Sequence, residues 1–177
     1  MGREEQGLAV SRLRYQVTPR TLCFARHGED VLLLKGAPHK RIWANRYNGL
    51  GGHVEAGEDI LSATLREARE ESGLILRDPR LAAVVHVDGG DPNLGVLFFV
   101  FTAWADDKTV RESPEGTLEW HPLTRLPAAD MAPDLPVILP RIMALPPGAE
   151  PLFLAYSYDE ADRLVIRRAG EAAPLTP

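Results

Sequence analysis

Short apolar runs, each bounded by polar or turn-forming residues, recur along the chain and are typical of β-strands. They predict strands at residues 21–26, 31–35, 81–86, 96–105 and 118–122. Two more runs, 152–157 and 163–168, flank a polar turn and predict a hairpin near the end of the sequence. Because hairpin turns join two pairs of these strands, we expect a mixed or antiparallel sheet.

One segment, about residues 59–72, instead spaces its apolar residues for a helix. Leu61, Leu65 and Ala68 fall at i, i+4 and i+7 and form one stripe, and a glycine follows as a helix stop. A second, shorter helix is predicted over 133–143, where internal prolines weaken the pattern. Strands with few helices at their margins predict an α+β or α/β/α layered domain.

The composition is that of an ordinary globular protein. Of the 177 residues, 45% are hydrophobic and 25% are charged, and a chain of this length can bury a core without disulfides. Because no repeat or glycine/serine linker divides it, we predict one domain over 15–168 with tails at 1–14 and 169–177. The one cysteine, Cys23, lies in an apolar run and is expected in the core.

Charge and hydropathy argue against some partners. A net charge of -5 spread over both signs offers no basic face for long nucleic acids, whose phosphates lysine and arginine neutralise. Residues 1–6 lack the apolar stretch of a signal peptide, and no segment has the length of a membrane span, so we expect a cytoplasmic protein without a membrane partner. A phosphate-bearing ligand would therefore need a metal ion to balance its charge.

Three glutamates stand together on the first predicted helix. Glu67, Glu70 and Glu71 lie at i, i+3 and i+4, a spacing that brings their carboxylates onto one face. A face of this kind is commonly just solvated, here balanced in part by Arg66 and Arg69. The alternative is a bound cation that offsets their repulsion, and oxygen-only ligands favour Mg²⁺ or Mn²⁺ over zinc.

The flanks of this helix favour the metal site. Before it, closely spaced glycines in 50–58 allow a tight loop and close approach of the backbone to a phosphate. Residues 52–74 resemble the Nudix hydrolase signature: a glycine, five residues, a glutamate, seven residues, then Arg-Glu-aliphatic-x-Glu-Glu-x-Gly-aliphatic. Every fixed position matches, namely Gly52, Glu58, Arg66, Glu67, Glu70, Glu71 and Gly73, with Ala68 and Leu74 at the aliphatic places.

The resemblance implies a Nudix fold, an α/β/α sandwich whose mixed sheet carries a loop-helix-loop motif. It also implies hydrolysis of a nucleoside diphosphate linked to another group. Glu70 and Glu71 would be metal ligands, Glu67 a further ligand or the base that activates water, and Arg66 and Glu58 a pair that orients the cluster. A bound Mg²⁺ would neutralise phosphate oxygens and lower the pKa of a bound water.

Segments outside the motif resemble the branch of the family that removes oxidised purine nucleoside triphosphates, such as 8-oxo-dGTP, from the nucleotide pool. Residues 47–52, Tyr-Asn-Gly-Leu-Gly-Gly, are similar to that branch's Trp-Asn-Gly-Phe-Gly-Gly, whose asparagine contacts the base. The resemblance gives Asn48 that role, whereas the residues alone equally indicate a turn beside glycine. Gly51, Gly52 and His53 would then lie beside the phosphates.

Two later segments extend this resemblance. Glu115, in an acidic segment before Trp120, would add a distal carboxylate to the metal site, although a plain loop charge is an equal alternative. Asp134 resembles an aspartate that recognises the purine edge, but Leu135 replaces a second aspartate and Ala132 replaces a tryptophan. These departures predict weaker base selectivity, because a buried polar contact discriminates analogues better than an apolar wall does.

The leading hypothesis is a Mg²⁺-dependent pyrophosphohydrolase that converts a purine nucleoside triphosphate to the monophosphate and pyrophosphate. Two alternatives stay open. The motif reads the diphosphate and the metal alone, so ADP-ribose, a dinucleotide or an isoprenoid diphosphate are rival substrates, and a non-catalytic nucleotide-binding module would keep the same fold. Monomer and homodimer are equally open. Phe99 and Phe101, which alternate with Phe98 and Val100, are expected in the core more than in a pocket wall.

Overall fold

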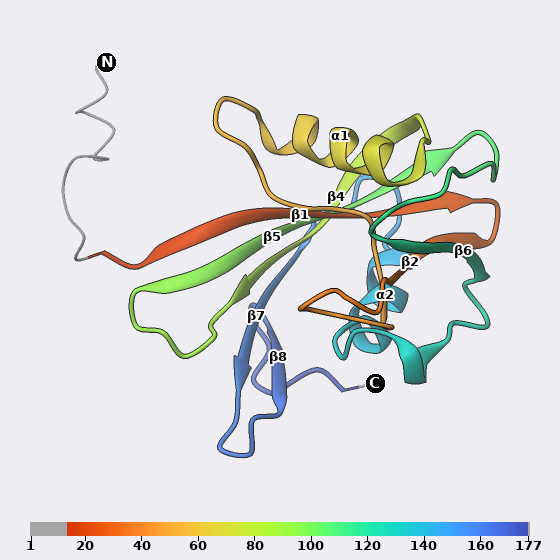
Figure 1. Ribbon diagram of the computed structural model, residues 1–177. Coiled ribbons are helices and arrows are strands. Elements are labelled where there is room, and N and C mark those ends of the chain that lie inside the picture. Colours follow the sequence, from red (N-terminus) through yellow and green to blue (C-terminus); the bar gives the residue numbers. More distant parts are fainter. Residues whose placement is uncertain (1–13, 177) are drawn as a thin grey trace.

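Eight strands form one mixed sheet in residues 14–176, the part of the chain that the computed structural model describes (Figure 1). The strands are β1 (Gln16–His27), β2 (Asp30–Gly36), β3 (Tyr47–Asn48), β4 (Leu76–Val87), β5 (Leu94–Ala105), β6 (Gly116–Pro122), β7 (Leu152–Tyr158) and β8 (Leu164–Arg168). Their order is β3-β2-β1-β5-β4-β7-β8, and β6 also pairs with β2. Because the β1–β5 and β4–β7 pairs are parallel while the others are antiparallel, the predicted mixed sheet is confirmed.

All seven predicted strands are present, but five of them begin one to five residues earlier than predicted, and the short strand β3 was missed. β1 starts at Gln16 instead of 21, β4 at Leu76 instead of 81 and β5 at Leu94 instead of 96. The added parts of β1 and β4 are polar or contain proline, and the register of β4 shifts between Arg77 and Arg80. Hydrophobic alternation cannot reveal such segments, although their backbone groups pair with β5.

The hairpin of β1 and β2 opens directly after its turn. Its paired residues are Arg26 with Val31 and His27 with Asp30, and β2 then pairs with β6 along its full length. The segment after β3 lies against β1 instead, where Leu50 exchanges two backbone hydrogen bonds of 2.6 and 3.0 Å with Cys23. This pairing places the glycine-rich turn of the Nudix-like motif beside the central strands.

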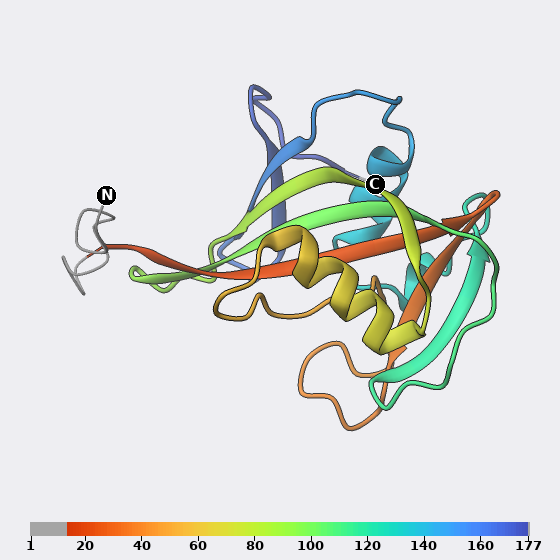
Figure 2. The ribbon, with the colours of Figure 1, turned by 90° about the horizontal axis from the view of Figure 1, so that it is seen from above.

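Helices α1 (Ile60–Ser72) and α2 (Leu135–Met143) cover opposite faces of the sheet (Figures 1 and 2). Along β1 the buried side chains alternate between two cores. Phe24 packs with the residues of α2, whereas its neighbours Cys23 and Ala25 pack in the core on the α1 side. The predicted α/β/α layered domain is therefore confirmed, and Cys23 is buried as expected.

Both ends of α1 follow from local sequence. Asp59 caps the first turn by accepting hydrogen bonds from the backbone N–H groups of Leu61 and Ser62, each at 2.9 Å. Gly73 ends the helix with a φ of 79°, which glycine adopts without a clash, and its N–H donates to the Arg69 carbonyl at 2.9 Å. The length of α1 and the direction of its side chains are thus set by the motif itself.

The C-terminal part of the chain closes the α2 side. A short 3₁₀ turn, Ala128–Asp130, leads into α2, and Pro136 lies in the first turn of that helix, where its missing N–H has no partner to lose. After β8 the chain returns, because the Leu175 N–H donates to the Ile166 carbonyl at 2.8 Å and its side chain packs against the α2-side core. The tail expected at 1–14 lies outside the described residues apart from Arg14. No helix of the described residues is long and apolar enough to cross a membrane.

Candidate active site

Arg66 is the charged centre of the motif. Its guanidinium forks onto Glu58, with Nε to Oε1 and Nη2 to Oε2 both at 3.0 Å. Its Nη1 donates to Glu67 at 3.0 Å and to Glu70 at 3.1 Å. The hydrogen bond from Arg66 lowers the pKa of Glu58 and the contact with Glu58 raises the pKa of Arg66, so the pair stays ionised. One arginine therefore orients the loop glutamate and two of the helix glutamates.

Gly51 and Gly52 are positions where a side chain would collide with the site. A Cβ at Gly52 would stand 2.4 Å from Oε1 of Glu67, so any side chain there would displace that carboxylate. Gly51 has a φ of 150°, and a Cβ there would lie 2.2 Å from the Thr21 carbonyl oxygen of β1. The glycine turn can thus pass between the strand and α1 only because both positions lack a side chain.

Glu71 is buried beneath this turn, with 7% of its surface exposed. Its Oε2 accepts the Gly51 N–H at 2.8 Å. Burial raises the pKa of Glu71 to about 7, and the charge of Glu67 adds to this increase while the Gly51 hydrogen bond opposes it. An approaching cation would favour the ionised form of this carboxyl group and so release its proton near neutral pH.

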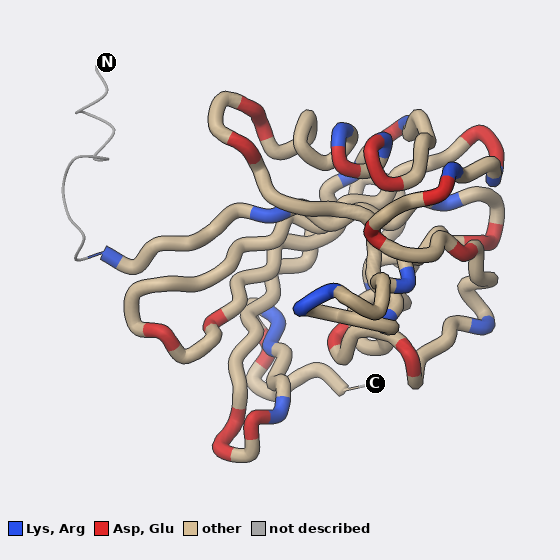
Figure 3. The backbone as a smooth tube through the Cα atoms, viewed as in Figure 1, with Lys and Arg blue, Asp and Glu red and all other residues tan. Residues whose placement is uncertain are grey.

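A cavity of about 490 Å³ gathers these groups, and we call it the carboxylate cavity. Its acidic lining consists of Glu67, Glu70 and Glu71 from α1 and Glu115 from the loop before β6. Its basic and imidazole lining consists of Lys40, Arg20 and His53. Figure 3 shows the same contrast along the backbone, with acidic positions on α1 and its preceding loop and a basic stretch on the loop of residues 37–46.

Each carboxylate of this cavity already has a partner. Nζ of Lys40 lies 2.7 Å from Oε2 of Glu115, and Arg66 and Gly51 hold the helix glutamates. Within residues 14–176, no three His, Cys, Asp or Glu side chains stand together as a preformed metal cluster. The donor set still fits a divalent cation, because its carboxylates supply oxygen ligands and Gly52 places no side chain beside Glu67. The buried Nε of Arg20 has no hydrogen-bond partner, so it is free to donate to an anionic ligand.

His53 lies at the rim of the carboxylate cavity and contacts Arg20. Nη2 of Arg20 donates to Nε2 of His53 at 2.7 Å. The two residues are joined across the β1 edge by an isolated backbone bridge as well. The fold thus brings His53, which we expect beside the phosphates, to the carboxylate cavity together with the guanidinium group of Arg20.

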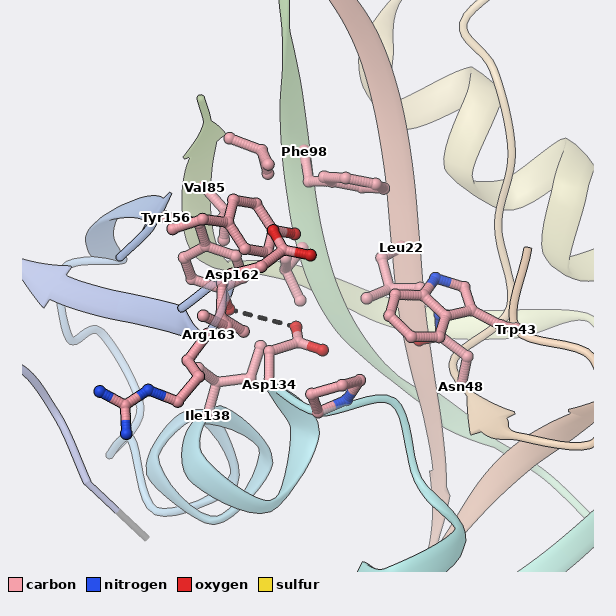
Figure 4. Close-up of a pocket in the computed structure, with 15 residues that line it drawn as sticks. Leu22, Trp43, Asn48, Val85, Phe98, Asp134, Ile138, Tyr156, Asp162 and Arg163 are labelled. Atoms are coloured by element: carbon pink, nitrogen blue, oxygen red, sulfur yellow. Dashed lines mark hydrogen bonds between the residues drawn. The ribbon is translucent and has the colours of Figure 1, made fainter. Parts of the chain in front are cut away.

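A second cavity, of about 410 Å³, opens on the α2 side of the sheet, and we call it the apolar cavity (Figure 4). Its walls are mostly aliphatic and aromatic and come from distant parts of the chain: Leu22, Val85, Phe98, Val100, Ile138 and Tyr156. Asn48 and Asp134 are two of its few polar groups, and they lie on opposite sides of it (Figure 4). An apolar cavity with few polar groups is the usual form of a small-molecule site.

Asp134 precedes α2 but does not cap the helix with its side chain. Its Oδ2 instead accepts the hydroxyl of Tyr156 at 3.2 Å, and burial raises the pKa of Asp134. On the other side, Oδ1 of Asn48 accepts the Gly49 N–H at 2.8 Å, as a turn residue does. That contact leaves the amide nitrogen of Asn48 as its hydrogen-bond donor, so the turn role and a ligand role are compatible.

A smaller cavity of about 150 Å³ lies between the two, because it shares wall residues with both, and we call it the connecting passage. It shares Leu22, Trp43, Asn48 and Phe98 with the apolar cavity, and Arg20, Lys40, Ile42, Gly51, Gly52 and Glu71 with the carboxylate cavity. The two predicted halves of the site, metal ligands and base contacts, thus line neighbouring cavities that share walls.

Sequence reasoning missed Arg20, Trp43 and Tyr156 as lining residues. None of them belongs to a motif, and only the fold brings β1, the loop of residues 37–46 and β7 together. The alternation of side chains along β5 is a signal in the sequence that separates residues lining the apolar cavity from residues of the core. Phe98 and Val100 face the apolar cavity, whereas Phe99 and Phe101 pack in the α1-side core. The expected core role is therefore confirmed for Phe99 and Phe101, and their neighbours Phe98 and Val100 form part of the cavity wall.

A layered α/β/α domain that presents four carboxylates beside a glycine turn is suited to hold a cation against an anionic ligand. The family model described as the NUDIX domain matches residues 14–142. The chain belongs to the Nudix family and is a hydrolase. Members of this family generally use divalent metal ions and act on nucleotide substrates.

Relatives and solved structures agree with this assignment. The chain is 34% identical over 118 residues to YvcI, an uncharacterized Nudix hydrolase of Bacillus subtilis, with 64% of this chain and 71% of that protein covered. It is 36% identical over 117 residues to the oxidized purine nucleoside triphosphate hydrolase of Mus musculus, with 64% and 72% covered. The mutator MutT protein from Bacillus halodurans has a TM-score of 0.68 at 25% identity, with 88% of this chain and 99% of that chain covered. The resemblance to the oxidised-purine branch is thus supported.

Proposed function

We propose that this Nudix hydrolase is a Mg²⁺-dependent pyrophosphohydrolase that cleaves a purine nucleoside triphosphate to the monophosphate and pyrophosphate. The observation that carries the proposal is the connecting passage. It places a cavity of carboxylates and cations at one end and an apolar cavity with Asn48 and Asp134 at the other. A nucleotide has the same two parts, a polyanionic chain and a flat base with polar edges.

The carboxylate cavity supplies the phosphate end. Glu67, Glu70, Glu71 and Glu115 would hold Mg²⁺ or Mn²⁺, which when bound neutralises phosphate oxygens and lowers the pKa of a water molecule. The pair of Arg66 and Glu58 keeps Glu67 and Glu70 oriented through the contacts described above. In this proposal Glu67 or one of its neighbours accepts the proton of the attacking water.

Cationic side chains on the opposite side of the glycine turn would receive the rest of the triphosphate. Lys40 pairs with Glu115, and Arg20 pairs with His53. Because Lys40 and Arg20 both line the carboxylate cavity, each can exchange its present partner for a phosphate oxygen of a bound ligand. The backbone of Gly51 and Gly52 lies between them and allows close approach of an anion. These groups position the phosphate chain and need no change of fold to do so.

The apolar cavity would receive the base. Asn48 offers an amide donor, and Asp134 offers a carboxyl group whose position is set by Tyr156. The carboxyl oxygens of Asp134 would accept hydrogen bonds from the N–H groups of a purine edge. The name of the mouse relative, an oxidized purine nucleoside triphosphate hydrolase, supports a purine here.

A substrate panel with identification of products by mass tests the proposal. The protein with Mg²⁺ is expected to release pyrophosphate and a monophosphate from 8-oxo-dGTP, dGTP or dATP. Turnover of ADP-ribose, a dinucleotide or an isoprenoid diphosphate with none of these three would reject the substrate class but keep the hydrolase. A Glu70→Gln variant that hydrolyses as fast as the wild type would remove the assigned metal role.

A further inference from the structure

Trp43 belongs to no motif, yet its indole lines both the apolar cavity and the connecting passage. We propose that Trp43 is a specificity-determining residue on which the flat nucleobase stacks. This inference rests on the proposed function for the identity of the ligand. It goes beyond that function because it assigns base selection to the loop of residues 37–46, which lies outside the helix motif and outside the pair of Asn48 and Asp134.

The position of Trp43 is suited to stacking. Figure 4 shows Trp43 with Leu22 and Asn48 on one side of the apolar cavity, and Asp134 and Tyr156 on the other. A planar ring between these sides can lie on the indole while its edge reaches the hydrogen-bonding groups of Asn48 and Asp134. Trp43 is 43% exposed as a residue, so part of its surface is uncovered and accessible to such a ligand.

The loop that carries Trp43 is fastened at its base. The Gly36 N–H donates to the Arg46 carbonyl at 3.0 Å, the Asn45 N–H donates to the Gly36 carbonyl at 2.9 Å, and the Ala37 N–H donates to the Glu115 carbonyl at 2.9 Å. A Cβ at Gly36 would lie 2.4 Å from the Trp43 carbonyl oxygen. The backbone of Trp43 is therefore packed against the end of β2, and its indole is carried by a fixed loop.

The backbone at Trp43 has a conformation that large residues rarely adopt. Its φ is 61°, and that of Asn45 is 59°, both in the left-handed region. Asparagine tolerates this region, but a tryptophan there is strained, and such strain is concentrated at binding and catalytic sites. A glycine would relieve the strain but would lose the indole. The structure thus retains a strained side chain at a position where glycine would avoid the strain.

The same loop also reaches the carboxylate cavity. Lys40 lines that cavity, and Ile42 lines both it and the connecting passage. A base stacked on Trp43 and a phosphate chain next to Lys40 would contact one loop at two points. This arrangement favours ligands whose base and phosphates are separated by a sugar, and it favours purines over pyrimidines because the larger ring covers more of the indole.

A fluorescence titration tests the stacking without hydrolysis. The probe is dGMP, which has no anhydride bond, added to metal-free protein in the presence of a chelator. Stacking is expected to quench the tryptophan emission of the wild type and of Trp104→Phe, and the quenching is expected to be lost in Trp43→Phe. Trp104 is the matched control because it is 38% exposed and lines neither the apolar cavity nor the passage. Equal quenching in Trp43→Phe and wild type overturns the proposal.

Kinetics then test selectivity. Trp43→Ala is expected to lower kcat/KM for dGTP roughly 5- to 100-fold, the usual effect of removing a base-stacking aromatic residue, whereas Trp43→Phe retains most of it. An unchanged kcat/KM for dGTP in Trp43→Ala overturns the proposal. If no triphosphate is hydrolysed by the wild type, the proposed function fails, and the dGMP titration still decides the stacking.

A glycine variant separates binding from folding. Trp43→Gly is expected to leave Tm unchanged or to raise it by about 2–4 °C, because the left-handed strain is relieved, while dGMP binding falls. If the Trp43 side chain only stabilised the fold, its removal would lower Tm and leave dGMP binding unchanged. A lower Tm together with unchanged dGMP affinity therefore overturns the proposal.

Discussion

The carboxylate cavity is lined by charges that are already paired, whereas the apolar cavity is lined mainly by side chains that pair with nothing. In the first, Arg66 and Lys40 engage Glu67, Glu70 and Glu115 through ion pairs. In the second, Asp134 has a hydroxyl partner, and the remaining walls come largely from hydrophobic residues of several strands and α2. Charge-assisted hydrogen bonds require short distances and strict geometry, while apolar walls act through their shape. Changes in the first cavity should therefore alter the rate of the chemical step, and changes in the second should alter the choice of ligand.

The largest expected effect comes from Glu67→Gln in the carboxylate cavity. Glutamine keeps an oxygen that accepts from Arg66 but is neither a base nor an anionic ligand, so we expect kcat to fall roughly 10²- to 10⁴-fold. The measurement is steady-state kinetics with dGTP together with a dGMP binding titration, in which we expect the affinity for dGMP to stay unchanged. Glu55→Gln is the control, because Glu55 is exposed in the loop that precedes α1. A fall in dGMP affinity as large as the fall in kcat would break the separation of the two cavities.

Gly52→Ala tests the geometry of the same cavity without removing a charge. The added Cβ would stand 2.4 Å from Oε1 of Glu67 and must displace that carboxylate, so we expect kcat/KM to fall about 10²-fold. Gly89→Ala is the matched control, since a Cβ there meets no atom within 4 Å. Full activity in Gly52→Ala would show that Glu67 tolerates displacement and that its position is not part of the mechanism.

The pH dependence of stability reports on the buried charge of Glu71. Burial raises its folded-state pKa to about 7, above the ordinary value of 4.5, so the folded protein binds a proton that the unfolded chain has lost between these two values. The folded state is therefore favoured at low pH, and this contribution is lost as pH rises from about 4.5 to about 7. Between pH 5 and 7.5 we expect the free energy of unfolding of the metal-free protein to fall by about 2 kcal/mol through this group.

The measurement is chemical denaturation of the wild type and of Glu71→Gln at both pH values. The difference between the two proteins isolates the titration of Glu71, because all other groups are shared. An identical pH dependence in both proteins would show that the carboxyl group is hydrated in solution. A substitution of Asp134 in the apolar cavity would not isolate one carboxyl group in this way, because it would also change the hydrogen bond of the Tyr156 hydroxyl.

The smallest expected effect is that of Asp134→Asn. The amide keeps the shape and can still accept from Tyr156, so the fold is preserved while the recognition of the base edge changes. We expect kcat/KM for dGTP to fall about tenfold with kcat little changed, as for the loss of one hydrogen bond to a charged group. The control is Asp130→Asn, an exposed aspartate in the preceding turn. A loss in kcat with KM unchanged would place Asp134 in the chemical step and undo the comparison.

The two cavities also differ in how far the sequence could predict them. The residues of the motif are close in sequence, and a helix with a cap at Asp59 and a stop at Gly73 converts their spacing directly into geometry. Lys40 and Glu115 lie 75 positions apart, yet they meet because β2 pairs with β6, from Gly36 with Gly116 to Asp30 with Pro122. No periodicity encodes a contact of that kind.

The apolar cavity was harder to predict for the same reason. Its walls combine β1, β4, β5, α2 and the β7–β8 hairpin, and Tyr156 reaches Asp134 only once these elements have packed. Aromatic residues such as Trp43 and Tyr156 carry no local signal that separates a cavity wall from a core position. Alternation identifies which residues of β5 share a face of the sheet. Which face packs against α1 and which faces the α2 side is set by the tertiary packing of these helices.

The parallel ladder of β1 and β5 has a consequence for how the chain acquires its activity during synthesis. Every residue of β1 in this ladder pairs with one 78 positions later, as Gln16 does with Leu94 and Arg26 with Trp104. The complete motif of residues 52–74 leaves the ribosome well before β5 does, and the surface on which α1 packs includes Phe101 and Ala103 of that late strand. Contacts of such sequence separation form slowly, because a long loop must close before any of them is gained. A nascent chain that already carries Glu67, Glu70 and Glu71 therefore still lacks β5, the strand on which their helix packs, and cannot yet hold these glutamates in place.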